Sequence, residues 1–248
     1  MTPDISIITI NYNDLDGLYG TLCSIAAQEY RSFELIVVDG HSDDGSAKLL
    51  EDFAPLIDRW VSEPDGGIYD AMNKGVALAR GTYVNFMNAG DCFYDGSVLD
   101  CARAVIAAEQ PEIFCGRAYA QHSGKLYKYN DALWKGMVCS HQATFSKLAL
   151  NLRFPFSTDY AIASDYRFYV QCETAGARLH HADIDVARID TSGVSFHGLE
   201  ARTMERLRIC QKFYRTSEVY RYFQAFARDN DLTLPEWAAT EERWMDGT

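Results

Sequence analysis

The sequence predicts an α/β fold in which a mostly parallel central sheet is flanked by helices and followed by a C-terminal helical segment. Three observations predict it. Strand-like runs alternate with helical patterns over residues 5–109, the run at 5–10 is β-branched as in a buried strand, and polar residues stand where four strands end. Such alternation is typical of a parallel sheet covered on both faces, and ligands bind these sheets beyond the carboxyl ends of the strands.

The first half of the chain carries the clearest pattern. Leu18, Leu22 and Ile25 recur at helical spacing after the cap residues at 11–14. Turn and cap residues at 42–45 and a glycine-containing loop at 63–67 precede two more helices. Strands are expected at 5–10, 33–39, 59–62 and 82–87, and further helices near 46–53, 68–79 and 97–109.

The second half is less regular. A helix is expected at 164–175, with Ser164 as its N-cap and Gly176 as its terminator, and 199–226 is largely helical in pattern. We expect one domain over 1–198, made of the halves 1–95 and 96–198, and a helical appendage over 199–248. Strands are plausible at 112–119, 125–130, 139–145, 178–181 and 183–189.

Composition excludes some classes of function. The chain has 248 residues and a formal net charge of −12, which argues against nucleic acid as a partner because that binding rests on basic patches. An acidic protein that binds an anionic substrate needs a cation at the site. The seven cysteines are scattered without a Cys-x-x-Cys pair, as expected in a reducing compartment. No signal-peptide pattern or apolar span stands out, so we expect a cytoplasmic protein.

Four strand ends carry polar residues, namely Asn11, Asp39, Glu63 and Asp91. Asp91 follows Gly90 in a turn, where it either caps the chain locally or binds Mg²⁺ or Mn²⁺, hard cations that also bridge to phosphates. Asp39 either caps its own turn or accepts the N3–H of a uracil ring.

Three further segments offer chemistry. The loop with Gly66 and Gly67 permits close backbone approach to a ligand, and Asp70, Asn73 and Lys74 follow it on one helical turn. Lys74 is either a solvated surface lysine or a group that neutralises a phosphate.

Asp165 opens a predicted helix, where it complements the helix dipole or serves as a general base. His141 could line an acceptor side and His197 could complete a metal site, although structural roles are common for histidines at such spacings.

Together these segments resemble the family-2 glycosyltransferases, which have the glycosyltransferase-A fold. The match covers about residues 5–195 and is strongest over 5–95. It includes Asn11-Tyr12-Asn13, the strand end Asp39-Gly40, the segments 28–30, 42–45, 63–75 and 79–81, Asn88-Ala89-Gly90-Asp91, Ser140-His141-Gln142, Ala163-Ser164-Asp165-Tyr166 and the small-residue segment 192–195.

The resemblance implies roles for matching residues. Asp91 takes the last position of the family's Asp-x-Asp metal motif, with Ala89 in place of the first aspartate, and Asp165 is the catalytic base. His141 and Gln142 belong to the acceptor side. The residues implied on the nucleotide and donor side are Thr9, Asn11, Asp39, Asp70, Asn73, Lys74 and Gly90.

The resemblance also implies an activity, with 1–95 as the nucleotide-sugar half and 96–198 as the acceptor half. We expect an inverting transferase that uses Mn²⁺ or Mg²⁺ to move a sugar from a nucleotide-diphosphate donor, a UDP-sugar, to an acceptor hydroxyl. Synthesis of polysaccharide or lipid-linked oligosaccharide is the expected context. The alternative is a non-catalytic sugar-nucleotide binding module or assembly partner.

Two other enzyme classes fit less well. A nucleotidyltransferase places a glycine-rich basic loop after its first strand, where this chain has Asn11-Tyr12-Asn13-Asp14. A dehydrogenase needs Gly-x-Gly-x-x-Gly at that point, which the chain lacks.

The segment 201–228 stands out by charge, because it holds seven basic and two acidic residues interleaved with aromatic ones. Two interpretations are open: a packing helix with a solvated basic face, or peripheral contact with the inner face of a membrane. The basic residues are Arg202, Arg206, Arg208, Lys212, Arg215, Arg221 and Arg228.

Overall fold

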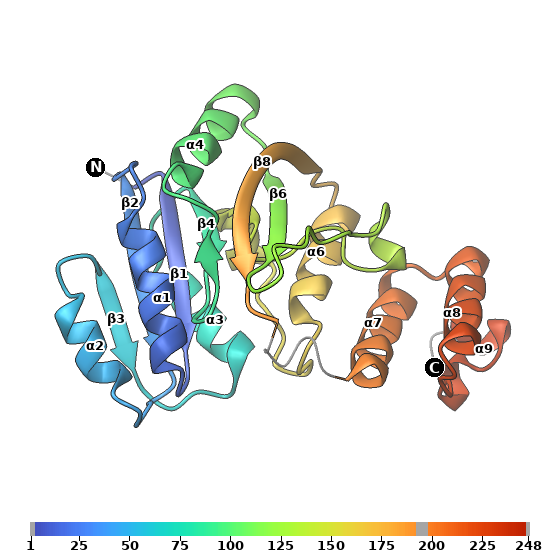
Figure 1. Cartoon of the computed structure of the whole chain (residues 1–248). Coiled ribbons are helices and arrows are strands. Elements are labelled where there is room, and N and C mark those ends of the chain that lie inside the picture. The colour runs from blue at the N-terminus through green and yellow to red at the C-terminus, as the bar shows by residue number, and fades with distance from the viewer. Residues whose placement is uncertain (1–2, 192–197, 247–248) are drawn as a thin grey trace.

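The computed structural model describes residues 3–191 and 198–246 and shows helices on both sides of one curled sheet (Figure 1). The strands are β1 (Ile5–Asn11), β2 (Phe33–Asp39), β3 (Arg59–Ser62), β4 (Tyr83–Phe86), β5 (Cys92–Phe93), β6 (Ile113–Ala120), β7 (Thr144–Lys147) and β8 (Leu179–Ile189). The helices are α1 (Leu15–Ala26), α2 (Ser46–Asp52), α3 (Ile68–Leu78), α4 (Val98–Glu109), α5 (Leu148–Arg153), α6 (Ser164–Thr174), α7 (Leu199–Phe213), α8 (Ser217–Asp229) and α9 (Glu241–Asp246), with 3-10 turns η1 (Leu133–Lys135) and η3 (Glu236–Ala238).

The sheet confirms the predicted α/β class. Its strand order is β3-β2-β1-β4-β7-β6-β8-β5, and the first four of these strands run parallel. Strand β7 is antiparallel to both of its neighbours, so the half built from later residues is mixed. In the parallel half, Asn11 is in register with Asp39, and Asp39 with Ser62, which gathers their side chains at one edge.

Alternation along β1 creates two cores. Ile8 and Ile10 pack with α3, α6 and the C-terminal helices, whereas Ile5 and Ile7 pack with α1, α2 and α4. Because α7, α8 and α9 contribute to the first of these clusters, the segment 199–246 shares the core of the preceding residues. The predicted domain division at 198 stays a prediction.

Several predicted boundaries are wrong. No strand forms at 125–130, where the pairing is a single bridge between Tyr119 and Leu126. The strand expected at 139–145 is β7, which begins only at Thr144, because the preceding residues form a loop toward the cavity described below. The two strand segments expected between 178 and 189 are one strand, β8.

The helix ends in the structure confirm one predicted cap and correct two other predictions. Asp14 caps α1 by accepting a hydrogen bond from the Gly17 amide, as the cap residues predict. Ser164 is not the N-cap of α6, because that position belongs to Ala163 and Ser164 is the first helical residue. The long C-terminal helical pattern breaks before Ser217, where the Thr216 side chain caps a second helix, α8.

Among the aromatic residues of 201–228, Phe223 is buried and the others are half-buried. Tyr222 packs edge-on against Trp134 and Phe223 packs near Trp244. The exposed basic residues of this segment are Arg208, Lys212, Arg215, Arg221 and Arg228. Membrane contact through 201–228 stays a prediction. Over the described parts of the chain, no helix combines the length and apolarity needed to cross a membrane.

Candidate active site

A cavity of about 910 Å³ opens at the carboxyl ends of β1, β2 and β4. One side comes from the nucleotide-side segments predicted above, including Asn11, Gly40 and Asp65. The other side comes from the loop before β7, the start of α6 and two arginines of α7. The cavity therefore lies where polar strand ends predicted a site, but later elements complete it.

Asp91 lies at the base of this cavity, in a turn made possible by Gly90 at φ +91°. Its carboxylate is 5% exposed and accepts hydrogen bonds from the Gln142 amide (2.9 Å) and the backbone N–H of Asp190 (2.9 Å). Burial raises the pKa of Asp91 to about 6, although both hydrogen bonds favour the charged form. The group is therefore largely ionised at neutral pH, as a cation ligand must be.

His141, the residue before Gln142, contacts a second carboxylate, that of Asp165. His141 Nδ1 lies 3.1 Å from Asp165 Oδ2, and His141 Nε2 lies 3.2 Å from the Asn88 side-chain nitrogen. Since that Asn88 nitrogen donates, Nε2 accepts and the ring proton sits on Nδ1, facing Asp165. Consecutive residues thus hold Asp91 and Asp165 in one cavity.

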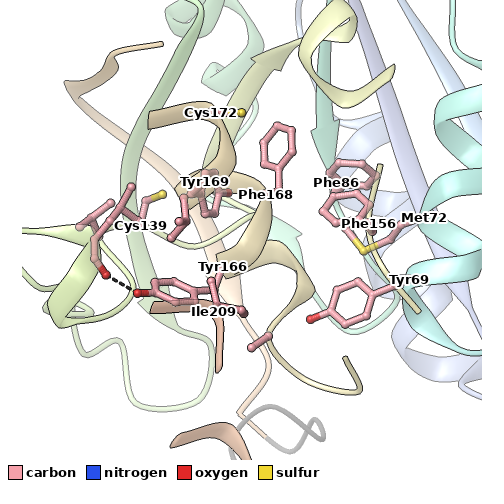
Figure 2. Packing of buried hydrophobic residues seen from close by; sticks show 14 of the residues in the cluster. Tyr69, Met72, Phe86, Cys139, Phe156, Tyr166, Phe168, Tyr169, Cys172 and Ile209 are labelled. Carbon is pink, nitrogen blue, oxygen red and sulfur yellow. Dashed lines mark hydrogen bonds between the residues drawn. The ribbon is translucent and has the colours of Figure 1, made fainter. Parts of the chain in front are cut away.

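A second side chain, Tyr69, lies beside Asp165 and was not among the predicted site residues. The Tyr69 hydroxyl lies 3.3 Å from Asp165 Oδ1 and donates to the Ile162 carbonyl at 2.6 Å. Tyr69 projects from α3 toward α6 beside the packed rings of Phe86 and Phe156 (Figure 2). The position of Tyr69 within the motif segment 63–75 could have indicated a role at the site, but an aromatic side chain in a helix suggested core packing.

Asn11 and Asp39 form a buried network at the edge of the cavity. Asp39 accepts hydrogen bonds from Asn11 Nδ2 (2.8 Å), Ser42 Oγ (2.6 Å) and Ser62 Oγ (2.7 Å). Burial acts to raise the pKa of Asp39, but these hydrogen bonds outweigh it and hold the pKa below its usual value. Asn11 lines the cavity, whereas Asp39 and Thr9 lie beneath its surface, so direct contact of those two with a base stays a prediction.

Asp70, Asn73 and Lys74 lie behind the cavity wall. Asp70 accepts from the Gly66 N–H, Lys74 pairs with Glu63 at 2.9 Å, and Asn73 exchanges two hydrogen bonds with the backbone of Phe156. The cavity is lined instead by Pro64, Asp65, Gly67, Ile68 and Ala71 of this region. The geometry gives the three predicted residues a bracing role, and their direct contact with a donor stays a prediction.

The residues present suit a cation that is shared with a ligand. Asp91 is a buried, ionised carboxylate at the cavity, and Asp14 and Asp190 approach the same turn at Gly90. Over residues 3–191 and 198–246, no three ligating side chains gather as a ready-made metal site. A divalent ion at Asp91 would therefore take its other oxygens from phosphates and water. His197 and the segment 192–195 lie outside the described residues.

Comparison with known proteins gives a consistent result. The model of the family described as glycosyl transferase family 2 matches residues 6–166. An uncharacterised glycosyltransferase of Mycobacterium tuberculosis is 34% identical over 212 residues, which cover 79% of this chain and 78% of that protein. A PGL/p-HBAD biosynthesis glycosyltransferase of Mycobacterium bovis is 34% identical over 179 residues, which cover 68% of this chain and 70% of that protein.

Solved structures show the fold. TarS of S. aureus, in complex with UDP-GlcNAc, matches 98% of this chain and 79% of its own with a TM-score of 0.71 at 16% identity. The mannosyltransferase PcManGT of Pyrobaculum calidifontis matches 100% of this chain and 70% of its own with a TM-score of 0.61 at 18% identity. The expected glycosyltransferase-A fold is confirmed, and the family model together with the mycobacterial relatives shows that this chain belongs to glycosyl transferase family 2.

Proposed function

We propose that this glycosyltransferase moves a sugar from a UDP-sugar to an acceptor hydroxyl with inversion of the anomeric configuration. One observation carries the proposal. Two carboxylates with different surroundings share the cavity: Asp91, held by Gln142 beside the strand ends, and Asp165, held by His141 at the start of α6. An inverting transfer needs two such groups, one near the leaving diphosphate and one near the attacking hydroxyl.

Asp165 serves as the general base in this scheme. It takes the proton of the acceptor hydroxyl while that oxygen bonds to the anomeric carbon, and the bond from this carbon to the diphosphate breaks with its electron pair leaving on the nucleotide. The His141 Nδ1–H keeps the carboxylate oriented. General-base help of this kind contributes roughly 10²–10⁴-fold in rate.

The donor's diphosphate belongs at Asp91. The chain bears a formal charge of −12, so a divalent cation, Mn²⁺ or Mg²⁺, would be held there by Asp91 and would neutralise the charge that develops on the leaving group. TarS with UDP-GlcNAc supports a UDP-sugar donor, and PcManGT with GDP-Man and Mn²⁺ supports metal dependence.

The acceptor is proposed to be a polysaccharide or a lipid-linked saccharide. The mycobacterial relative's name, which refers to PGL/p-HBAD biosynthesis, supports a glycan or glycolipid product. Transfer at the inner face of a membrane would suit such an acceptor and the exposed cations of α7 and α8.

UDP release by purified protein tests the proposal. A panel of UDP-sugars, followed by GDP- and dTDP-sugars, is incubated with Mn²⁺ and with water or an added saccharide as acceptor. We expect turnover of at least one UDP-sugar, and we expect Asp165→Asn to be about 10²–10⁴-fold slower with unchanged UDP affinity, because an amide keeps the shape but cannot take the proton. The anomer formed, read by NMR, should be opposite to that of the donor.

Asp159→Asn is the matched control, since Asp159 is an exposed carboxylate in the segment before α6 and bonds to Ser157. Equal turnover by wild type and Asp165→Asn would remove Asp165 from its role. Nucleotide binding without turnover of any donor would favour the non-catalytic binding module instead.

A further inference from the structure

Both ring nitrogens of His141 have a side-chain neighbour. On one side Nδ1 lies 3.1 Å from Asp165 Oδ2, and on the other Nε2 lies 3.2 Å from the side-chain nitrogen of Asn88. Asn88 is 8% exposed and lines the same cavity, although it was not among the predicted site residues. The hydrogen bond at one histidine nitrogen decides whether the other carries the proton, so Asn88 is placed to act on Asp165 through His141.

The backbone at Asn88 is fixed without help from its side chain. The N–H groups on either side of Asn88 donate to the carbonyls of Ile8 and Ile10 at 3.0 Å, which extends the pairing of β4 with β1. The Asn88 carbonyl accepts from the Asp91 N–H at 3.0 Å and from the Thr21 hydroxyl at 3.1 Å. A substitution of the Asn88 side chain should therefore leave in place the turn that carries Asp91.

The backbone at His141 is fixed as well, by a different residue of β4. Asn85, which is fully buried, donates through its side-chain nitrogen to the carbonyls of Gln142 and Thr144, both at 2.9 Å. The His141 carbonyl accepts from the Thr144 N–H at 3.2 Å. These contacts leave free the rotation of the His141 ring and the choice of its tautomer, and the partners at its two nitrogens determine both.

We infer that Asn88 is a positioning residue, which donates to His141 Nε2 and thereby keeps the ring proton on Nδ1, facing Asp165. This role rests on the proposed function, in which Asp165 is the base. An ionised carboxylate only accepts hydrogen bonds, so a ring nitrogen without a proton would face it unfavourably. A cationic ring would face it favourably but would make it a weaker base, and a donor at Nε2 disfavours the cation.

The first test reads the tautomer directly. Nitrogen NMR on the full chain with isotope-labelled histidine gives the protonation of each ring nitrogen, and His141→Gln identifies the His141 signals. We expect a proton on Nδ1 alone in the wild type. Asn88→Asp keeps the size of the side chain but places an acceptor at Nε2, so it should bring a proton onto that nitrogen. A proton on Nε2 in the wild type, or an unchanged His141 spectrum in Asn88→Asp, would overturn the inference.

The second test separates positioning from donor binding. Asn88→Ala leaves His141 Nε2 without its donor, and we expect kcat to fall about tenfold or more while the donor KM and the affinity for UDP with Mn²⁺ stay within about twofold. Added to Asp165→Asn, the same substitution should slow turnover by less than about twofold, because it acts through the base. A tenfold loss of UDP affinity in Asn88→Ala would assign the residue to the donor instead. Independent effects of the two substitutions would likewise contradict a role through Asp165.

Gln28→Ala is the control for general damage to the fold. It removes a buried amide that bonds to the backbone of Asp95 and Leu99 rather than to a residue that lines the cavity. It should lower stability and leave kcat and the His141 spectrum unchanged, and an equal loss of kcat in Gln28→Ala and Asn88→Ala would reduce Asn88 to a structural role. Absence of turnover by the wild type with every donor would contradict the proposed function, and the His141 spectra would then decide alone whether Asn88 sets the tautomer.

Discussion

His141 and Gln142 are neighbours in the chain, yet their side chains hold carboxylates from two different elements. Short sequence motifs predict both residues, together with Asp91 and Asp165, as site residues, and the structure brings all four to one cavity. The contacts of Gln142 with Asp91 and of His141 with Asp165 could not be predicted, because they depend on how the loop before β7 crosses the sheet edge.

Other residue-level expectations depended on which way a helix faces. Asp70, Asn73 and Lys74 share a polar helix face, but spacing alone does not say whether that face meets a ligand or the neighbouring loop. In the folded chain the Asn73 amide is used by the Phe156 backbone and Lys74 by Glu63. These contacts join residues that are far apart in sequence, so no local sequence pattern predicts them.

The buried carboxylate of Asp91 predicts a pH dependence of stability. Its pKa rises from 3.8 to about 6 on folding, so the folded protein binds more protons than the unfolded chain between these values. Stability from this group therefore falls as pH rises through that window, by roughly 3 kcal/mol at most. We expect the unfolding free energy of metal-free wild type, minus that of Asp91→Asn, to decrease from pH 4.5 to 7 in urea titrations. If this difference in unfolding free energy does not change between pH 4.5 and 7, the raised pKa of the buried Asp91 is contradicted.

Helix α7 is the element whose role the sequence least revealed. The charge of 201–228 predicted a surface, but Glu205 faces inward and accepts the backbone N–H groups of Ala161, Ile162 and Ala163 at 2.7–2.9 Å. These three groups precede the first turn of α6, which starts with Ser164 and Asp165. Helix α7 thus fixes the segment that leads into the helix carrying the proposed base, through a long-range contact that no local sequence pattern predicts.

Loss of this contact between Glu205 and the segment 161–163 should destabilise the protein. Glu205→Gln leaves one acceptor oxygen for three N–H groups and turns an amide nitrogen toward them, so we expect a loss of about 1–3 kcal/mol in urea unfolding. Glu200→Gln, at an exposed position in the first turn of the same helix, should cost less than about 1 kcal/mol. Equal effects of the two substitutions would show that the contact with 161–163 contributes nothing to stability.

Element boundaries were predicted well where strands are buried and poorly where aromatic residues face the cavity. Tyr127 and Tyr129 alternate as in a strand, but they line the cavity and leave a single bridge at Leu126. The parallel strands β1, β2 and β4, in contrast, are buried on both faces and rich in β-branched and aromatic residues, because helices cover both sides. Their pattern therefore follows from burial, which the sequence records directly.

Across the whole molecule, the first four strands supply one side of the cavity and the later elements supply the other. Figure 1 shows α7 beside α6, with α8 and α9 farther out along the same end. The C-terminal helices share a core with the central sheet, since Leu207, Ile209 and Trp244 belong to the cluster that holds Ile8 and Ile10. The strand ends proposed to bind the nucleotide and the proposed base on α6 therefore belong to one folded body.

The most direct test of this account is the linkage between UDP and Mn²⁺ binding, measured by calorimetry on wild type, Asp91→Asn and Asp165→Asn. We predict that each ligand tightens the other in wild type, that Asp91→Asn loses this linkage, and that Asp165→Asn retains it while losing turnover. The account would be contradicted if wild type bound UDP with no dependence on the metal, or if Asp165→Asn lost the linkage as Asp91→Asn does.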